Sequence, residues 1–202
     1  MKFYCLSDTH GGPPPASLGY MSGQVILHAG DFYNEGSPKA HFGWDEVLAK
    51  NDILMVRGNH DCVDTPLLDG HDLSLGLACA GDIWVLGLGW CGQEYNQLPP
   101  EAVMTKRVMA LLQACSQAMS DGDRSVLVTH YLPTGPHFKN WEGWEFKCIN
   151  SLIEAIAPLA VIAGHRHGLA GKTFQQDDAM IVFPGPKGGW LETYEDGAKW
   201  KA

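Results

Sequence analysis

Histidine and aspartate, which can bind metal ions and transfer protons, and asparagine, whose amide oxygen can bind a metal ion, occur together in five short blocks of this sequence. Each block follows a short apolar run of strand length. Ligands bind beyond the carboxyl ends of strands in α/β sheets, so we expect the blocks to meet at one site. The blocks are Ser7-Asp8-Thr9-His10-Gly11, His28-Ala29-Gly30-Asp31, Arg57-Gly58-Asn59-His60-Asp61, Thr129-His130-Tyr131 and Gly164-His165-Arg166-His167-Gly168.

Each block on its own has an ordinary structural explanation. Gly30-Asp31 is usual in a turn, and a lone His130 after a strand is more often a hydrogen-bonded polar residue than a ligand. The third block is more specific, because four residues that favour turns stand together at one strand end. Five such blocks, each at a strand end, indicate a catalytic centre rather than unrelated turns.

These side chains suit a two-metal centre. Carboxylate, imidazole and amide oxygen ligands suit Mn²⁺, Fe, Ni²⁺ or Zn²⁺, and the lack of cysteine in the blocks argues against a structural zinc site. Two metals about 3.5–4 Å apart need a shared ligand, usually a carboxylate. Asp8 and Asp31 offset only half the charge of two dications, so the local field would be positive enough to hold a phosphate.

The order of the blocks resembles that of the calcineurin-like metallophosphoesterases, and the blocks run from Asp8 to His167. The resemblance implies an α/β fold in four layers, a two-sheet β-sandwich flanked by helices. It also implies a single domain over residues 1–202, with a dinuclear centre on the loops at the strand ends.

The resemblance further implies a role for each block. His60 would lie near the leaving group without binding metal, and Asp61 would orient it. The cofactors would be two divalent metal ions, with Mn²⁺ favoured and Fe, Zn²⁺ or Ni²⁺ as alternatives. The expected metal ligands are Asp8, His10 and His167 for one metal, Asn59, His130 and His165 for the other, and Asp31 as the bridge.

The implied reaction is hydrolysis of a phosphate ester by a hydroxide held between the two metals. His60 would protonate or hydrogen-bond the leaving alkoxide. No covalent intermediate is needed, so we assign no serine or cysteine nucleophile. An inactive scaffold of the same fold need not keep a complete ligand set; because every expected ligand type is present, we favour an enzyme.

The sequence departs from the protein phosphatases of this family. Members that act on phosphoserine and phosphothreonine carry Gly-Asp-x-Val-Asp-Arg-Gly, whereas this chain has Gly-Asp-Phe-Tyr-Asn-Glu-Gly from Gly30. It is more similar to the small single-domain phosphodiesterases. Without the Asp-Arg pair to meet the second charge of a monoester, we predict a preference for phosphodiesters. A phosphomonoesterase or Ser/Thr protein phosphatase is the alternative, and a nuclease ranks third.

The composition excludes several classes of protein. Hydrophobic residues make up 45% and charged residues 18% of the 202 residues, which excludes wholesale disorder. The 14 basic and 23 acidic residues give a net charge of −9, so strong binding to nucleic acid or to an anionic membrane is not expected. The expected partner is a small phosphate-ester substrate, with nucleotide-derived esters among the candidates; a homo-oligomer stays open.

The location follows from what the sequence lacks. It has no signal-peptide pattern and no run of 18 or more apolar residues, and its six cysteines form no Cys-x-x-Cys pair. We therefore expect a cytoplasmic protein with reduced thiols.

Short apolar runs alternate with helical patterns along the chain, as in α/β proteins. Two loops, at 11–23 and 132–144, are rich in Pro and Gly, and the second holds Trp141 and Trp144, which would pack locally or form a platform for a nucleobase or a partner. His28 lies inside an apolar run and is expected in the core or behind the ligands. Strands are predicted at 1–7, 25–29, 53–57, 73–80, 83–88, 125–129, 159–163, 179–183 and 191–195, and helices at 41–49, 102–119 and 148–157.

Overall fold

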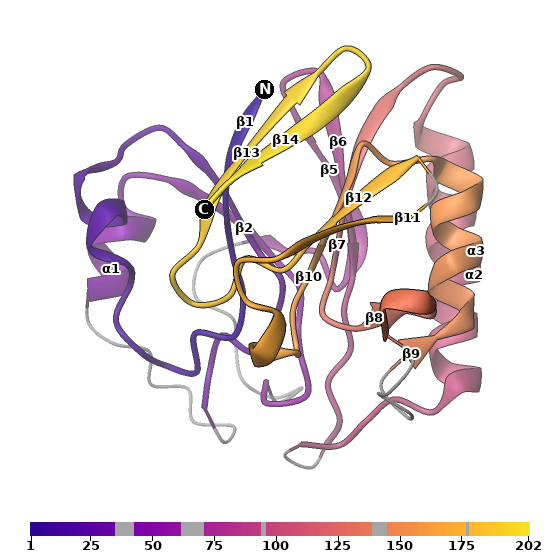
Figure 1. Cartoon of the computed structure of the whole chain (residues 1–202), viewed down its shortest axis with the longest axis horizontal. Helices are drawn as coiled ribbons and strands as arrows, with labels where there is room; N and C mark the ends of the chain where they lie inside the picture. Colours follow the sequence, from indigo (N-terminus) through magenta and orange to yellow (C-terminus); the bar gives the residue numbers. More distant parts are fainter. Residues whose placement is uncertain (35–42, 62–70, 94–95, 139–144, 177) are drawn as a thin grey trace.

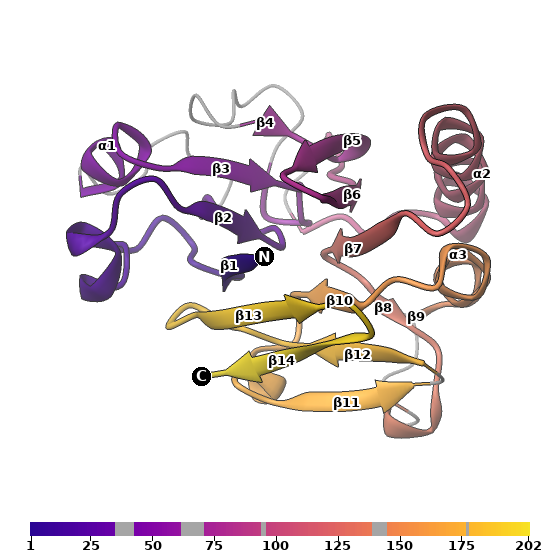
Figure 2. The same cartoon turned by 90° about the horizontal axis from the view of Figure 1, so that it is seen from above.

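Two β-sheets form the middle of the protein, and helices cover the outer face of each (Figures 1 and 2). The structure is a computed structural model of the whole chain and describes residues 1–34, 43–61, 71–93, 96–138, 145–176 and 178–202. Within these ranges there are two six-stranded sheets and one two-stranded pair. The predicted α/β sandwich flanked by helices is confirmed.

The first sheet has the strand order β14-β13-β1-β2-β3-β4. Strands β1 to β4 are parallel, whereas β13 and β14 add an antiparallel extension beside β1. The strands are β1 (Lys2–Leu6), β2 (Val25–His28), β3 (Asp52–Met55), β4 (His71–Asp72), β13 (Gly189–Tyr194) and β14 (Gly197–Lys201).

The second sheet has the order β11-β12-β10-β7-β6-β5. Its four inner strands are parallel, and both edge strands are antiparallel to their neighbours. The strands are β5 (Leu75–Ala80), β6 (Ile83–Leu88), β7 (Arg124–Thr129), β10 (Ala160–Ala163), β11 (Thr173–Gln176) and β12 (Ala179–Val182); β8 (Leu132–Pro133) and β9 (Glu145–Phe146) form the separate pair.

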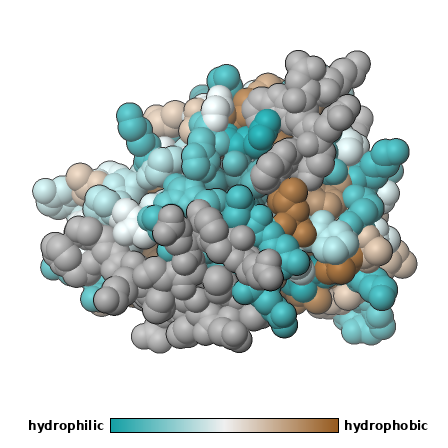
Figure 3. Space-filling view, turned by 90° about the horizontal axis from the view of Figure 1, so that it is seen from below, coloured by the Kyte–Doolittle hydropathy of each residue, from teal (hydrophilic) through white to brown (hydrophobic). Residues whose placement is uncertain are grey.

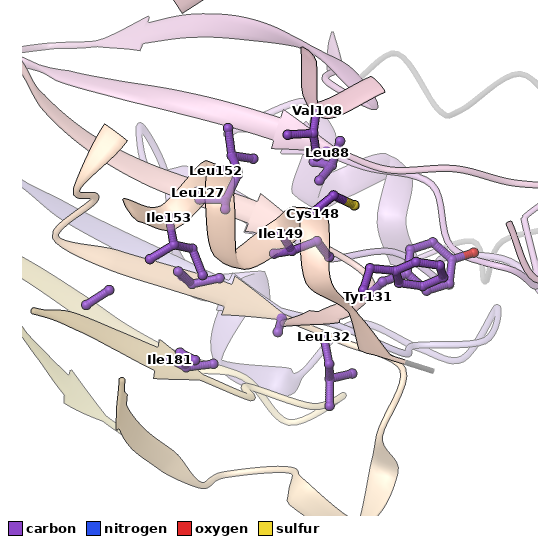
Figure 4. Close-up of a cluster of buried hydrophobic side chains, with 14 of the residues drawn as sticks. Leu88, Val108, Leu127, Tyr131, Leu132, Cys148, Ile149, Leu152, Ile153 and Ile181 are labelled. Carbon is purple, nitrogen blue, oxygen red and sulfur yellow. The ribbon is translucent and has the colours of Figure 1, made fainter. Parts of the chain in front are cut away.

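Helices form the two outer layers. The long helix α2 (Glu101–Ala118) and α3 (Lys147–Ile156) cover the second sheet, and α1 (Gly43–Leu48) packs beside the first sheet with the 3₁₀ turn η1 (Ala16–Tyr20). Figure 4 shows Ile149 and Leu152 of α3 over Leu127 and Ile181 of the second sheet. Two further 3₁₀ turns are η2 (Pro136–Phe138) and η3 (His167–Leu169). No helix of the described chain is long and apolar enough to cross a membrane.

Alternate residues of the central strands face two different apolar layers. In β7, Val126 and Val128 pack between the sheets, whereas Leu127 packs beneath the helices. In β10, Ile162 faces the layer between the sheets and Val161 the helices. Because both faces of these strands are buried, their sequence is a continuous apolar run and was recognisable as such.

The parallel strands bring the polar blocks to one end of the sandwich. Leu6, His28 and Met55 are in register across β1, β2 and β3. In the second sheet, Thr129 at the end of β7 pairs with Ala163 at the end of β10. The loops that leave these positions therefore emerge together, as the sequence predicts.

The predicted and observed elements differ mainly at the edges of the sheets. The sequence does not predict β4, β8, β9, β11 or β14. Strands β11 and β14 lie at the edges of their sheets, where part of each strand faces solvent. They therefore need no continuous apolar run, and they carry Gln and Lys at several positions. Residues 41–42 of the expected first helix and 139–144 of the expected second loop lie outside the described residues.

Candidate metal centre

One group of metal-binding atoms combines the loops after β1 and β10. The Nε2 atoms of His10 and His167 lie 3.0 Å apart. Asp8 Oδ1 lies 3.5 Å from His167 Nε2 and accepts a hydrogen bond of 2.9 Å from the backbone N–H of His165. These three side chains can hold one metal ion between them.

A second group combines the loops after β3, β7 and β10. Asn59 Oδ1 lies 3.0 Å from His130 Nε2 and 2.8 Å from His165 Nδ1, and the two ring nitrogens are 3.1 Å apart. Asn59 and His130 are almost completely buried. An amide oxygen and two imidazole nitrogens therefore converge on one point.

Asp31, from the loop after β2, lies between the two groups. Its Oδ1 atom accepts a hydrogen bond of 2.9 Å from the backbone N–H of His60. Its Oδ2 atom faces both groups, 3.4 Å from His130 Nε2 and 4.0 Å from His10 Nε2. Lone pairs this close repel each other unless a proton or a cation lies between them, so the donor set fits divalent metals.

His130 has a defined tautomer in this arrangement. Its Nδ1 atom lies 2.8 Å from the carbonyl oxygen of Ala29, to which it donates a proton. When the ring is neutral, its Nε2 lone pair points toward Asp31 and Asn59; a proton takes that place when the ring is charged. Such a hydrogen bond behind a metal-binding histidine sets its orientation and makes it a stronger ligand.

The pKa values show that positive charge is favoured at His130, beside Asp31, and disfavoured at His165. Burial lowers the pKa of His130, but the carboxylates of Asp31 and Asp8 outweigh it and raise that pKa to about 9. Burial raises the pKa of Asp31, yet His130 and His60 outweigh burial and hold it well below its usual range. Burial, together with His130, lowers the pKa of His165 to about 3, so its ring is an unprotonated donor.

Several of these residues have backbone conformations that are rare outside glycine. The φ angle is 55° at Asp8, 48° at His10, 56° at Asp31 and 68° at His165. Hydrogen bonds between loops hold this geometry, including Asp8 N–H to Gly30 O at 2.9 Å and His10 N–H to Asp31 O at 3.0 Å. Strained non-glycine residues cluster at functional sites, because only strong surrounding contacts maintain them.

Two glycines allow the loops to approach one another. Gly30 has φ +85°, and a Cβ atom there would lie 2.6 Å from His130 Nδ1. A Cβ atom at Gly58 would overlap Asp31 Oδ1. The glycines of the second and third blocks are therefore required by the close packing around Asp31 and His130.

Asp61 has a different set of contacts from the expected one. Its carboxylate accepts hydrogen bonds of 2.9 Å from the backbone N–H groups of Asp31, Tyr33 and Gly58. Burial, reinforced by the charge of Asp31, raises the pKa of Asp61 to about 6. These bonds fix the loop of Asp31, whereas the family resemblance implied that Asp61 orients His60.

His60 lies at the open side of the centre. Its ring stacks edge-on with that of His10 at 4.6 Å between centroids, and its Nε2 atom is 3.8 Å from Asp31 Oδ2. Its side chain is 20% exposed, against 1% for Asp31. His60 is thus the more accessible of the two, although it could also contribute to a metal site with His10 and Asp31.

The structure also shows residues outside the expected set. His28 is fully buried, as expected, and its Nε2 atom lies 3.0 Å from Thr9 Oγ1, behind the first group. Asn96, which no sequence pattern marks, accepts a hydrogen bond from Asn59.

Other residues near the strand ends complete the description of the site. Among the residues described, Arg57 pairs with Asp72 at 2.9 Å. Trp141 and Trp144 lie outside the described residues.

The surface at this end of the protein is polar. Figure 3 shows the molecule from below, at the carboxyl ends of the parallel strands, and the described residues at the centre of this face are mainly hydrophilic. A four-layer sandwich with a cluster of His, Asp and Asn at these strand ends defines the class of the metallophosphoesterases.

Comparison with known proteins identifies the family. The family model described as "Calcineurin-like phosphoesterase superfamily domain" matches residues 1–197. The chain therefore belongs to the calcineurin-like phosphoesterase superfamily, as its sequence blocks indicated.

Two curated relatives come from animals. The chain is 27% identical over 189 residues to UPF0046 protein K07C11.7 of Caenorhabditis elegans, a match that covers 83% of this chain and 63% of the relative. It is 36% identical over 63 residues to Metallophosphoesterase domain-containing protein 1 of Homo sapiens, which covers 30% of this chain and 19% of the relative. The chain thus spans less than two thirds of the length of these relatives.

Solved structures share the fold at low sequence identity. TT1561 of Thermus thermophilus is 14% identical with a TM-score of 0.67, over 99% of this chain and 97% of that one. Phosphopantetheinyl Hydrolase (PptH) from Mycobacterium tuberculosis is 14% identical with a TM-score of 0.62, over 91% of this chain and 88% of that one.

The contact between Gly30 and His130 leads to a prediction. Gly30→Ala should displace the His130 ring and weaken metal binding at least about tenfold, because the ring must leave its hydrogen bond to Ala29. Gly23→Ala is the matched control, since Gly23 also has a positive φ, +65°, but has nothing within 4 Å of the added Cβ. It should lower the free energy of unfolding by about 1–2 kcal/mol and leave metal binding unchanged.

Both effects are measured by calorimetric titration with Mn²⁺ and by denaturant unfolding. Equal metal affinities of Gly30→Ala and Gly23→Ala would contradict the argument that close approach, and not backbone strain alone, requires Gly30.

Proposed function

We propose that this protein is a metal-dependent hydrolase of phosphate esters that uses a dinuclear centre and prefers phosphodiesters. The observation that carries the proposal is the position of Asp31, whose Oδ2 atom faces His10 of one donor group and His130 of the other. A carboxylate in this position is able to bridge two metal ions.

The chemistry of the donors supports the choice of metal. Imidazole, carboxylate and amide oxygen ligands suit Mn²⁺, with Fe, Zn²⁺ and Ni²⁺ as alternatives. When bound, two such ions lower the pKa of a water molecule toward neutrality and neutralise the phosphoryl oxygens.

The residues of the chain then position and protonate the substrate. His60 is a partly exposed histidine beside Asp31 that belongs to neither of the two donor groups described above, and its imidazole supplies the proton that the leaving alkoxide needs. Its backbone N–H binds Oδ1 of Asp31, which ties the loop of the proton donor to the carboxylate proposed as the bridge. Asp61 accepts a hydrogen bond from the backbone N–H of Asp31.

Removal of the shared charge tests the dinuclear centre. Asp31→Asn should bind at most one tightly held metal and lose at least about 10³-fold in kcat, because the two ions would share no anion. Asp121→Asn removes the same charge from an exposed turn and should bind two metals with unchanged kcat. Metal analysis and calorimetric titration give the stoichiometry. Two tightly bound ions and full turnover in Asp31→Asn would rule out the bridge.

The role of His60 is tested by the leaving group. His60→Ala keeps the backbone N–H that holds Asp31, so it should keep its metals. Its kcat should fall roughly 10²–10⁴-fold for an alkyl ester, but far less for nitrophenolate, which leaves without a proton. The control is His137→Ala, which removes an exposed histidine that belongs to neither donor group. Equal losses for both substrates would show that His60 binds or positions the substrate instead.

The preference for diesters rests on the arginines near the strand ends. Arg57 donates to the Asp72 carboxylate at 2.9 Å, and Arg107 donates to the carbonyl oxygen of Ser74 at 2.6 Å. The charge of Arg57 is thus offset by a carboxylate, and one nitrogen of Arg107 is already bound to a carbonyl oxygen. A phosphodiester brings one negative charge and a monoester nearly two, so the diester makes the smaller demand on additional cations.

A direct comparison of substrates tests this preference. We expect bis-nitrophenyl phosphate to give a higher kcat/KM than mono-nitrophenyl phosphate with the same Mn²⁺-loaded protein. A tenfold preference for the monoester, about 1.4 kcal/mol in transition-state binding, would overturn the preference and favour a phosphomonoesterase. Such a result would leave the dinuclear centre itself intact.

A further inference from the structure

The loop that follows β6 lies against the loop that carries Asn59. The backbone N–H of Trp90 donates to Arg57 O at 3.1 Å, and that of Asn96 donates to Asn59 O at 2.9 Å. From the end of β7, the hydroxyl of Tyr131 donates to Trp90 O at 3.0 Å. The loop after β6 is therefore attached to the loops of two expected ligands of the second metal, Asn59 and His130.

The side chains of Asn59 and Asn96 form a direct pair. Asn59 Nδ2 donates to Asn96 Oδ1 at 2.6 Å. The other end of the same amide, Oδ1, lies 3.0 Å from His130 Nε2 and 2.8 Å from His165 Nδ1. Asn96 thus contacts the end of the amide that points away from the donor group.

The two ends of an asparagine amide are nearly identical in shape but opposite in hydrogen-bonding character. If the Asn59 amide turned over, its NH₂ group would face His130 and His165, where a cation would be repelled rather than bound. Because only 1% of Asn59 is exposed, water molecules can supply few of the hydrogen bonds that would otherwise determine how the amide is oriented. An acceptor at the far end favours the orientation in which the Asn59 oxygen points toward His130 and His165.

We propose that Asn96 is a positioning residue that holds the Asn59 amide with its oxygen toward the second metal. The proposal rests on the proposed dinuclear centre. Asn96 would not touch the metals or the substrate; it acts through Asn59. Partners behind a metal ligand typically account for about 10–100-fold in metal affinity, which sets the size of the expected effect.

The backbone at Asn96 allows a clean substitution. Its φ is +58°, in the left-handed region that Asn, Asp and Gly tolerate better than other residues. Asn96→Gly removes the acceptor and leaves the backbone N–H that bonds to Asn59 O. Asn96→Asp keeps an oxygen in place and offers no N–H in either orientation, so it should hold the Asn59 amide at least as well.

The test is calorimetric titration of metal-free protein with Mn²⁺. Wild type and Asn96→Asp should bind two ions with similar affinities. Asn96→Gly should bind one ion as wild type does and the other about 10–100-fold more weakly. Electron paramagnetic resonance with two equivalents of Mn²⁺, at a concentration too low to fill the weakened site, should show a coupled pair in wild type and mainly a single ion in Asn96→Gly, a signature that general destabilisation would not produce.

A second pair of variants, made in a protein that already carries Asn59→Asp, tests the amide orientation itself. Asn59→Asp has an oxygen at both ends, so orientation no longer matters at that position. In this background, Asn96→Gly should change the affinity of the weaker site by less than about threefold. The same loss in both backgrounds would mean that Asn96 supports the loop and not the amide.

The outcomes separate this inference from the proposed function. Two tightly bound ions in Asn96→Gly, as in wild type, would overturn the inference and keep the dinuclear centre. Fewer than two ions in wild type would overturn the dinuclear centre itself. Equal weakening of both sites in Asn96→Gly would also contradict the inference, because Asn59 belongs to one donor group only.

Discussion

The structure around the candidate site depends on one electrostatic constraint, the convergence of lone pairs around a buried carboxylate. His10 and His167 bring ring nitrogens to 3.0 Å, and Asn59 Oδ1 lies 2.8 Å from His165 Nδ1. Asp31, 1% exposed, lies between these two groups. Such an arrangement is stable only when a cation or a proton lies among the lone pairs. The raised pKa of His130, about 9, has the same cause, because the nearby carboxylates favour a proton on its ring. Divalent metals satisfy this requirement without using a proton.

The loops are held by one another more than by regular secondary structure. Asp8, Asp31 and His165 adopt positive φ angles, which the chain keeps because neighbouring loops donate and accept backbone hydrogen bonds. Asp61 connects the loops after β2 and β3 through three backbone N–H groups, and Asn96 connects the loop after β6 to that of Asn59. The candidate ligands are consequently positioned in advance, which would lower the free-energy cost of assembling a metal centre.

Membership of the calcineurin-like phosphoesterase superfamily accounts for the fold and for the donor cluster, but substrate choice depends on what surrounds them. In this chain the net charge is −9, and Arg57 and Arg107 already donate to protein groups. Because Asp72 offsets the charge of Arg57, bound metals would supply a large part of the local positive field, together with the charge that Arg107 keeps. This distribution of charge is the physical basis of our proposal that the protein prefers phosphodiesters to monoesters.

The sequence alone determined the types, the order and the strand-end positions of the candidate metal donors. An apolar run such as that of β10 must be buried on both faces, so the polar residues that follow it must lie beyond the end of the sheet. The alternation of apolar runs and helical patterns along the sequence predicted an α/β layered domain, and the family resemblance of its blocks implied the sandwich. Only the tertiary structure decided the contacts between loops. Asn96 lies 37 residues from Asn59, and Asp61 bonds to backbone atoms around Asp31, so neither role leaves a local pattern. The spacing of apolar residues along the sequence shows which side of one helix or strand is buried. These hydrogen bonds instead join separate loops, and the packing of the sheets decides which loops come together.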